Sequence, residues 1–269
     1  MTITSKHIGK HPSLTTVQAG SSASVANQMP DPAQFSDGRW KKLPAQLSSM
    51  TLARFDQDIC TNNHGISQRA MCFGLSLSWI NMIHAGKDHA TPYASAERMR
   101  FLGSFEGVVH ARTVHNFYRS EHKFLLEQAS ANPGVFSGAM AGTESLLQAA
   151  ELKGLKLKPV LEDKSNSGLP FLIACKQSGR QVSTDEAALS SLCDAILENK
   201  KGVMVIYSQE MAHALGFSVS ADSKRTTIFD PNLGEFHTHS KELADTIENI
   251  SLVDGLPLIG VQVFASKRH

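Results

Sequence analysis

The spacing of the hydrophobic residues changes near residue 200, and this change limits the possible folds more than any other feature of the chain. Before that point the clearest apolar runs have the spacing of helices. Beyond it they form short β-branched runs separated by turn residues, which is typical of strands. Helices followed by strands predict an α+β fold, because alternating βαβ units would mix the two patterns along the whole chain.

Four helices are predicted in the first part. They cover residues 71–83, 108–127, 143–153 and a run that begins at the capping box Ser183-Thr184-Asp185-Glu186. The first run is apolar around most of its circumference, which indicates a buried helix that Gly86 can terminate. The third has Thr143 as its expected N-cap and Gly154 after its end.

A mostly antiparallel sheet is predicted in the second part. Its strands are expected at residues 202–207, 212–220, 225–229, 236–238 and 258–264. A helix over residues 241–250, capped by Ser240, interrupts them. The C-terminal half therefore predicts a sheet on which the preceding helices can pack.

The chain divides into a leader and a folded domain. Residues 1–50 are rich in Ser, Thr, Gln, Ala and Pro and contain few large apolar groups, so they cannot bury enough surface to order themselves. From about Met50 the pattern becomes globular. We therefore expect a disordered leader over residues 1–50 and one domain over residues 51–269.

Composition and motifs exclude several classes of function. Lys and Arg number 26 against 25 Asp and Glu, so no net field favours a nucleic-acid partner. No apolar run reaches about 18 residues, so no membrane-spanning helix is expected. The four cysteines form no CxxC pair, which argues for a reducing compartment and against disulfides or a zinc knuckle. His237 and His239 lack an identifiable third ligand, so neither a metal nor another cofactor is expected.

Cys72 is the first candidate for chemistry, because it would lie in the first turn of the helix over residues 71–83. A thiol attacks a carbonyl as the thiolate, and a helix N-terminus lowers the pKa of a thiol. Cys193 lies within an apolar helical pattern and is interpreted as a small core residue.

Two residues of the C-terminal half can complete a site around this thiol. His213 follows Cys72 by 141 residues, and Asp230 follows His213 by 17 at the end of the next predicted strand. An imidazole can accept the thiol proton, and a carboxylate can orient the imidazole. The turn over residues 221–224 would bring the two strands side by side. These residues predict a Cys/His/Asp triad for nucleophilic catalysis.

Each triad residue also has a simpler explanation. A lone cysteine on an apolar helix is usually a core residue, and a lone histidine in a strand is usually structural. An aspartate before Pro-Asn usually bonds its own turn backbone. The order, the spacing and the helix-then-strand contexts favour the triad when the three residues are considered together.

An acyl-transfer site also needs hydrogen-bond donors for the oxyanion. The backbone N–H of Cys72 is one candidate. Gln68, four residues earlier, is a candidate side-chain donor, with Asn62 and Asn63 as competitors.

At these residues the chain resembles the YopT/AvrPphB family of cysteine proteases, which bacterial pathogens deliver into host cells by type III secretion. The resemblance rests on Cys72-Phe73-Gly74-Leu75-Ser76 with Trp79, on Ala212-His213-Ala214 and on Phe229-Asp230-Pro231-Asn232-Leu233-Gly234-Glu235-Phe236. It covers the chain from about Asn62 to the C-terminus, and the leader resembles the Ser-rich export signals of such effectors. Papain-like proteases show the same order, with His and Asn about 130 to 150 residues after the cysteine.

The resemblance implies a papain-like fold, in which a helical part with the catalytic cysteine at a helix start packs on a C-terminal antiparallel sheet. It also implies that Cys72, His213 and Asp230 form the catalytic triad. The expected partners are a plant host protein, whose cleavage alters host defence, and a secretion chaperone on the leader. The chain lacks the long pro-region and the exposed acylation signal of self-processing members, so self-processing and membrane targeting stay open.

Two other functions stay open from the sequence. Deamidases, transglutaminases and acetyltransferases also use Cys, His and Asp, and nothing in these residues selects water over an amine as acceptor. The third possibility is a protein that binds a host partner without catalysis and carries a vestigial triad.

Overall fold

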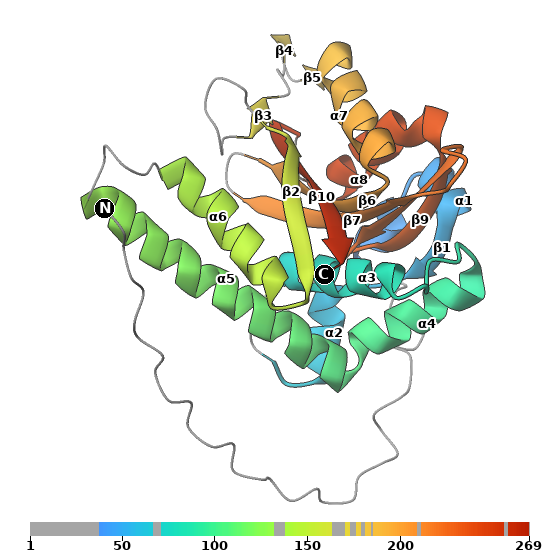
Figure 1. The fold of residues 1–269 in the computed structure, drawn as a ribbon. Helices are drawn as coiled ribbons and strands as arrows, with labels where there is room; N and C mark the ends of the chain where they lie inside the picture. The colour runs from blue at the N-terminus through green and yellow to red at the C-terminus, as the bar shows by residue number, and fades with distance from the viewer. Residues whose placement is uncertain are drawn as a thin grey trace, which may run out of the picture.

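A central antiparallel sheet organises the chain, with helices packed on both of its faces (Figure 1). The computed structural model describes residues 38–66, 71–131, 138–162, 170–172, 176–178, 181–183, 185–208, 211–255 and 258–268. The strands of the main sheet are β1 (Thr51–Arg54), β2 (Leu155–Leu161), β3 (Phe171–Leu172), β6 (Lys201–Tyr207), β7 (Ala212–Val219), β8 (Arg225–Asp230), β9 (Gly234–His239) and β10 (Gly260–Arg268). Their order is β1-β9-β8-β7-β6-β10-β2, with β3 paired to β10. A separate hairpin joins β4 (Lys176–Ser178) and β5 (Gln181–Ser183).

The helices form one layer on each face of the sheet. They are α1 (Ala45–Met50), α2 (Gln57–Asn63), α3 (Cys72–His84), α4 (Pro92–Gly103), α5 (Phe105–Ala131), α6 (Gly138–Glu151), α7 (Glu186–Asn199) and α8 (Leu243–Val253), with the 3-10 turns η2 (Gly38–Lys42) and η3 (Ser240–Glu242). Val203 and Val205 of β6 face the core of α3 to α6, whereas Met204 and Ile206 face the core of α1, α7 and α8. Burial on both faces explains why β6 is apolar from Gly202 to Ile206 and does not alternate.

The predicted C-terminal strands are confirmed, and so is the helical part that packs on them. The strict order of helices first and strands afterwards is wrong, because β1 and β2 come from the first part of the chain and form the two edges of the sheet. β1 has only four residues, too few for a periodic pattern. β2 begins Leu-Lys-Leu-Lys with its leucines buried, an alternation that indicates a strand.

Three predicted helix caps are wrong, although the helices themselves are present. Thr143 lies inside α6, which begins five residues earlier. Asp185 caps α7 by accepting two backbone N–H groups, whereas Ser183 belongs to β5. Ser240 lies in η3, where its hydroxyl donates to the carbonyl of Ser223. Several polar residues near each helix start can serve as the cap, and packing selects among them.

The folded domain begins earlier than the predicted boundary at residue 50. η2 and α1 contribute Trp40, 8% exposed, and Leu47, fully buried, to the core with α7 and α8. Residues 1–37 of the predicted leader lie outside the described residues. Among the helices of the described part, none is long and apolar enough to cross a bilayer.

Candidate active site

Cys72 is the first residue of α3, as predicted, and it is 8% exposed. Met71 is the N-cap and makes no side-chain hydrogen bond to the helix. The first N–H groups of α3 therefore have no acceptor within the helix, and their partial positive charge lies at the thiol. Gly74 lets α3 contact α5 closely, since a Cβ atom there would lie 2.1 Å from the carbonyl oxygen of Ala111.

His213 lies on β7, in the middle of the sheet and next to α3. The Ser76 hydroxyl donates to the carbonyl of Ala214 at 2.9 Å, which fixes α3 against the strand one residue from His213. The imidazole is buried, and its Nε2 faces Asp230. The ring also forms a side-chain hydrogen bond with Cys72, for which Nδ1 is the nitrogen left.

Asp230 ends β8, and its two carboxylate oxygens have different partners. Oδ2 lies 3.2 Å from Nε2 of His213. Oδ1 accepts the backbone N–H of Asn232 at 2.6 Å. The contact with the turn backbone and the contact with the imidazole thus belong to the same side chain, one oxygen each. The structure brings the three predicted residues Cys72, His213 and Asp230 together.

Burial and neighbouring charges oppose each other at these three groups. Burial alone would raise the pKa of Cys72, but the hydrogen bond and charge of His213 outweigh it, helped by backbone hydrogen bonds from Ala214 and Phe73, and the pKa is lowered. Burial would lower the pKa of His213, but the charge and hydrogen bond of Asp230 raise it well above its ordinary value. Burial would likewise raise the pKa of Asp230, and His213 lowers it. The arrangement favours a thiolate and an imidazolium beside a carboxylate.

A second carboxylate, Asp254, contacts the same imidazole and is absent from the sequence prediction. Its Oδ2 lies 3.4 Å from Nε2 of His213, and its side chain is 2% exposed. Burial and then the charge of Asp230 raise the pKa of Asp254 to about 7. The residue follows α8 and precedes Gly255, a context that indicates only a turn.

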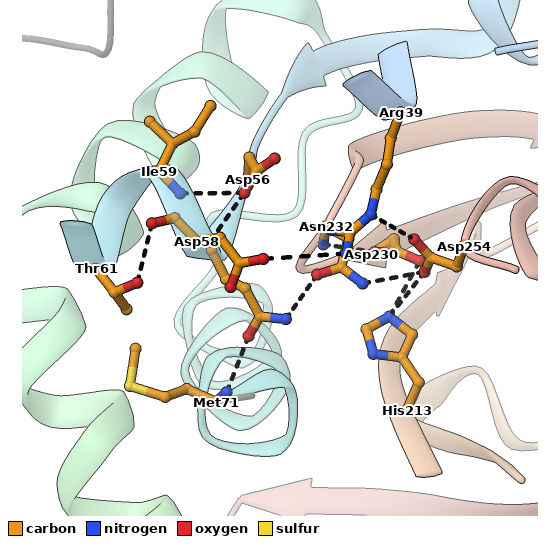
Figure 2. Close-up of polar contacts among 11 residues, drawn as sticks. Arg39, Asp56, Asp58, Ile59, Thr61, Met71, His213, Asp230, Asn232 and Asp254 are labelled. Carbon is orange, nitrogen blue, oxygen red and sulfur yellow. Dashed lines mark hydrogen bonds and ion pairs between the residues drawn. The ribbon is translucent and has the colours of Figure 1, made fainter. Parts of the chain in front are cut away.

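A chain of hydrogen bonds connects these carboxylates to the start of α3 (Figure 2). The side-chain amide of Asn232 donates to Asp254 at 3.1 Å and accepts from the amide of Gln57 at 2.6 Å. Gln57 in turn accepts the backbone N–H of Met71 at 2.9 Å. The residue before Cys72 is thereby tied to the residues around His213. Sequence reasoning missed Gln57 and Asn232 as well, because both bonds join distant segments.

Comparison with known families decides the class of the chain. The peptidase C58 family model, described as Yersinia/Haemophilus virulence surface antigen, matches residues 45–251. The chain belongs to this family. The cysteine protease class and the family resemblance predicted from the sequence are confirmed.

This C58 peptidase is similar to one curated protein in sequence and to one solved structure in fold. It is 92% identical to "Probable cysteine protease avirulence protein AvrPpiC2" of Pseudomonas syringae pv. pisi, over 269 residues and the full length of both chains. The crystal structure of the Pseudomonas avirulence protein AvrPphB superimposes with a TM-score of 0.54 at 18% identity, over 82% of this chain and 99% of that one. The second match concerns the fold alone, and it confirms the predicted papain-like fold.

Glu235, in the motif over residues 229–236, has a structural role in this C58 peptidase. The Glu235 carboxylate is fully buried and accepts hydrogen bonds from Trp79 at 2.6 Å, Ser95 at 2.8 Å and Arg98 at 2.6 Å. These contacts join β9 to α3 and α4. Trp79 is fully buried.

The predicted oxyanion donors are only partly described. Gln68 lies outside the described residues, which omit 67–70. Asn62 and Asn63 are exposed at the end of α2. The N–H of Cys72 is at the helix start, where a donor has no helical acceptor.

His237 and His239, the pair of histidines two residues apart in the sequence, both lie on β9. His237 contacts the Thr227 hydroxyl at 3.1 Å, and His239 is exposed. Among the described residues, the group with potential metal ligands is His213, Asp230 and Asp254, whose ligand atoms lie within 4.8 Å of one another. A metal there would displace the Nε2 proton that the carboxylates accept.

Proposed function

We propose that this chain hydrolyses a peptide bond of a host protein, with Cys72 as nucleophile, His213 as general base and acid, and Asp230 as the residue that orients the imidazole. The observation that carries the proposal is the hydrogen-bonded position of His213, between the Cys72 thiol and the Asp230 carboxylate. This is the geometry that nucleophilic catalysis by a thiolate requires.

The reaction proceeds through a thioester. The Cys72 thiolate attacks the carbonyl carbon, and the carbonyl electron pair moves onto the oxygen. The backbone N–H of Cys72 stabilises this oxyanion, and Gln68 is the second donor in the proposal. The C–N bond then breaks as His213 gives its proton to the leaving amine. Water attacks the thioester, passes its proton to His213, and releases the acid and the thiolate.

The surface beside the thiol supports a polypeptide as substrate. A groove of about 770 Å³ runs along α5 and is lined by Tyr118, Arg119, His122, Lys123, Leu126, Glu127, Ser130 and Ala131. The ring of Tyr118 packs 5.6 Å from that of Phe73. Burial, and then the negative charge of Cys72, raise the pKa of Tyr118, so the groove begins near the nucleophile. Its apolar and charged lining suits an extended peptide, whereas a small acyl donor would leave most of it empty.

The 92% identical relative is named as an avirulence protein of Pseudomonas syringae pv. pisi, which supports a plant protein as substrate and an effect on host defence. Delivery by type III secretion, with the leader as export signal and chaperone site, completes the proposal. A reporter fused to residues 1–37 should be exported by bacteria with a working type III apparatus and retained by bacteria without one. Equal export of the reporter by the two kinds of bacteria would contradict delivery by type III secretion.

The reaction is tested by comparing new protein N-termini in plant extract treated with the wild type, Cys72→Ala or Cys193→Ala. The wild type and Cys193→Ala should generate the same new N-termini, and Cys72→Ala should generate none. Circular dichroism melting curves of the three proteins control for folding. New N-termini that persist with Cys72→Ala would contradict the proposed nucleophile.

The same experiment separates the two alternative functions. Small mass shifts without fragments, dependent on Cys72, would replace hydrolysis by deamidation or acyl transfer. A host response that Cys72→Ala retains in full, without fragments or mass shifts, would indicate a binding protein.

A further inference from the structure

We propose that Asp254 is a positioning residue of the protease site, a second carboxylate that shares the Nε2 proton of His213 with Asp230 and stabilises the charged imidazole. The inference rests on the triad of the proposed function. It adds a fourth residue that acts on the thiol through His213.

The distances indicate a shared proton. Nε2 of His213 lies 3.2 Å from Oδ2 of Asp230 and 3.4 Å from Oδ2 of Asp254. Both distances exceed the 2.7–2.9 Å of a single charge-assisted N–H···O bond. Asn232 holds both carboxylates, with its backbone N–H on Asp230 and its side-chain amide on Asp254. The imidazole therefore has two acceptors that are fixed by one residue.

Fold stability does not explain this carboxylate. Asp254 is the C-cap of α8, where the helix dipole disfavours a negative charge. Its side chain is 2% exposed, and its Oδ1 has no hydrogen-bond partner among the described residues. Nε of Arg39 lies 3.8 Å from Oδ1. A buried carboxylate at a helix C-terminus costs stability. The hydrogen bond from Asn232 and the contact with Arg39 offset this cost only in part, since the pKa of Asp254 stays raised, and the contact with His213 gives the carboxylate a role at the site.

The charged groups around Asp254 link its ionisation to the imidazole. They are His213 from β7, Asp230 from β8 and Arg39 from η2, with Asp58 of α2 4.0 Å from Arg39. Two adjacent carboxylates ionise together only when a cation offsets their repulsion. Because the pKa of Asp254 is about 7, its second negative charge forms near neutral pH and then favours the imidazolium. Asp254 should thus extend the protonated range of His213 to higher pH.

The test compares alkylation of Cys72 by iodoacetate and by iodoacetamide across pH. The imidazolium attracts the anionic reagent, so the ratio of the two rates falls where His213 loses its proton. Asp254→Asn should move this fall to lower pH by about one unit, the effect of one charge at this distance in a water-like dielectric. Asp58→Asn, the control, removes the other carboxylate near Arg39 and should leave the curve in place.

The proposal would be overturned if the curve of Asp254→Asn, like that of the control Asp58→Asn, coincided with the wild-type curve. Asp254→Glu keeps the charge and should return the curve towards the wild type, whereas a merely structural residue would alter stability without moving it. Asp254→Ser, a smaller neutral side chain, gives the same comparison if Asp254→Asn does not fold. No protein substrate is needed, so this result is independent of the cleavage test with Cys72→Ala.

Discussion

Alkylation of the cysteines in the native protein tests whether the site holds a thiolate. The pKa of Cys72 lies below the ordinary 9.0. Burial, with the charges of Asp194 and Asp245, raises the pKa of Cys193 to about 11. At neutral pH two units of pKa correspond to about 100-fold in thiolate fraction, so Cys72 should exceed Cys193 by at least this factor.

The expected ratio of rates is smaller than the ratio of thiolate fractions. Thiolate nucleophilicity falls with pKa, with a Brønsted coefficient of about 0.4–0.5, which removes about tenfold over two units. The advantage of Cys72 over Cys193 is therefore at least about tenfold. Burial raises the pKa of Cys60 to about 12, so the same reasoning gives about 30-fold over Cys60. Cys193 is the more exposed of the compared pair, so access does not favour Cys72.

The assay uses iodoacetamide at neutral pH, with samples quenched over time and each cysteine followed on its own peptide by mass spectrometry. His213→Ala should remove the advantage of Cys72, because it removes the imidazolium. The urea-unfolded protein supplies the reference in which the four cysteines react alike. A native Cys72 that reacts no faster than Cys193 would refute the thiolate and the mechanism built on it.

Three further predictions concern stability. Glu235→Gln leaves Arg98 as a buried unpaired charge and should lower the free energy of unfolding by about 3–5 kcal/mol in urea titrations, and a change below 1 kcal/mol would contradict this role. Gly216→Ala places a Cβ atom 2.5 Å from the Trp79 ring, so it should lower the free energy of unfolding by about 1–3 kcal/mol and change the near-UV circular dichroism signal. If signal and stability were both unchanged, the ring would be free to move and the close packing would be contradicted. The pKa of Asp254 is raised from 3.8 to about 7 in the folded protein, so its ionisation opposes folding increasingly between those pH values and fully above pH 7. Asp254→Asn should therefore raise the free energy of unfolding by up to about 4 kcal/mol at pH 8 and change it little near pH 4. A variant that is less stable than the wild type at pH 8 would contradict this sign.

Local patterns predicted the parts of the fold that local interactions determine. The bounds of α3 agree with the predicted 71–83 to within one residue at each end. The prediction succeeds because apolar residues surround the helix and Gly86 follows it. The central strands were predictable for a similar reason, as burial on both faces demands apolar runs. The edge strand β1 was missed because its place depends on pairing with β9, 180 residues further along the chain.

The candidate site also combines contacts that the local sequence indicates with contacts that depend on the packing of distant segments. His213 and Asp230 lie on neighbouring strands joined by a short turn, so their proximity follows from a hairpin that the sequence indicates. Asp254 meets the same imidazole only because α8 packs on the sheet and ends beside β7, and no spacing along the chain encodes that position.

The alignment of the thiol with the imidazole depends on contacts of the second, non-local kind. Ser76 binds the carbonyl of Ala214, and Gln57 binds Asn232, across 138 and 175 residues of sequence. Each such hydrogen bond contributes only about 1 kcal/mol to stability. Ser76 nevertheless lies about one helical turn after Cys72, and Asn232 is hydrogen-bonded directly to Asp230. A loss too small to unfold the domain can therefore move the sulfur away from Nδ1. The residues that hold the site are consequently the ones that a sequence motif describes least well.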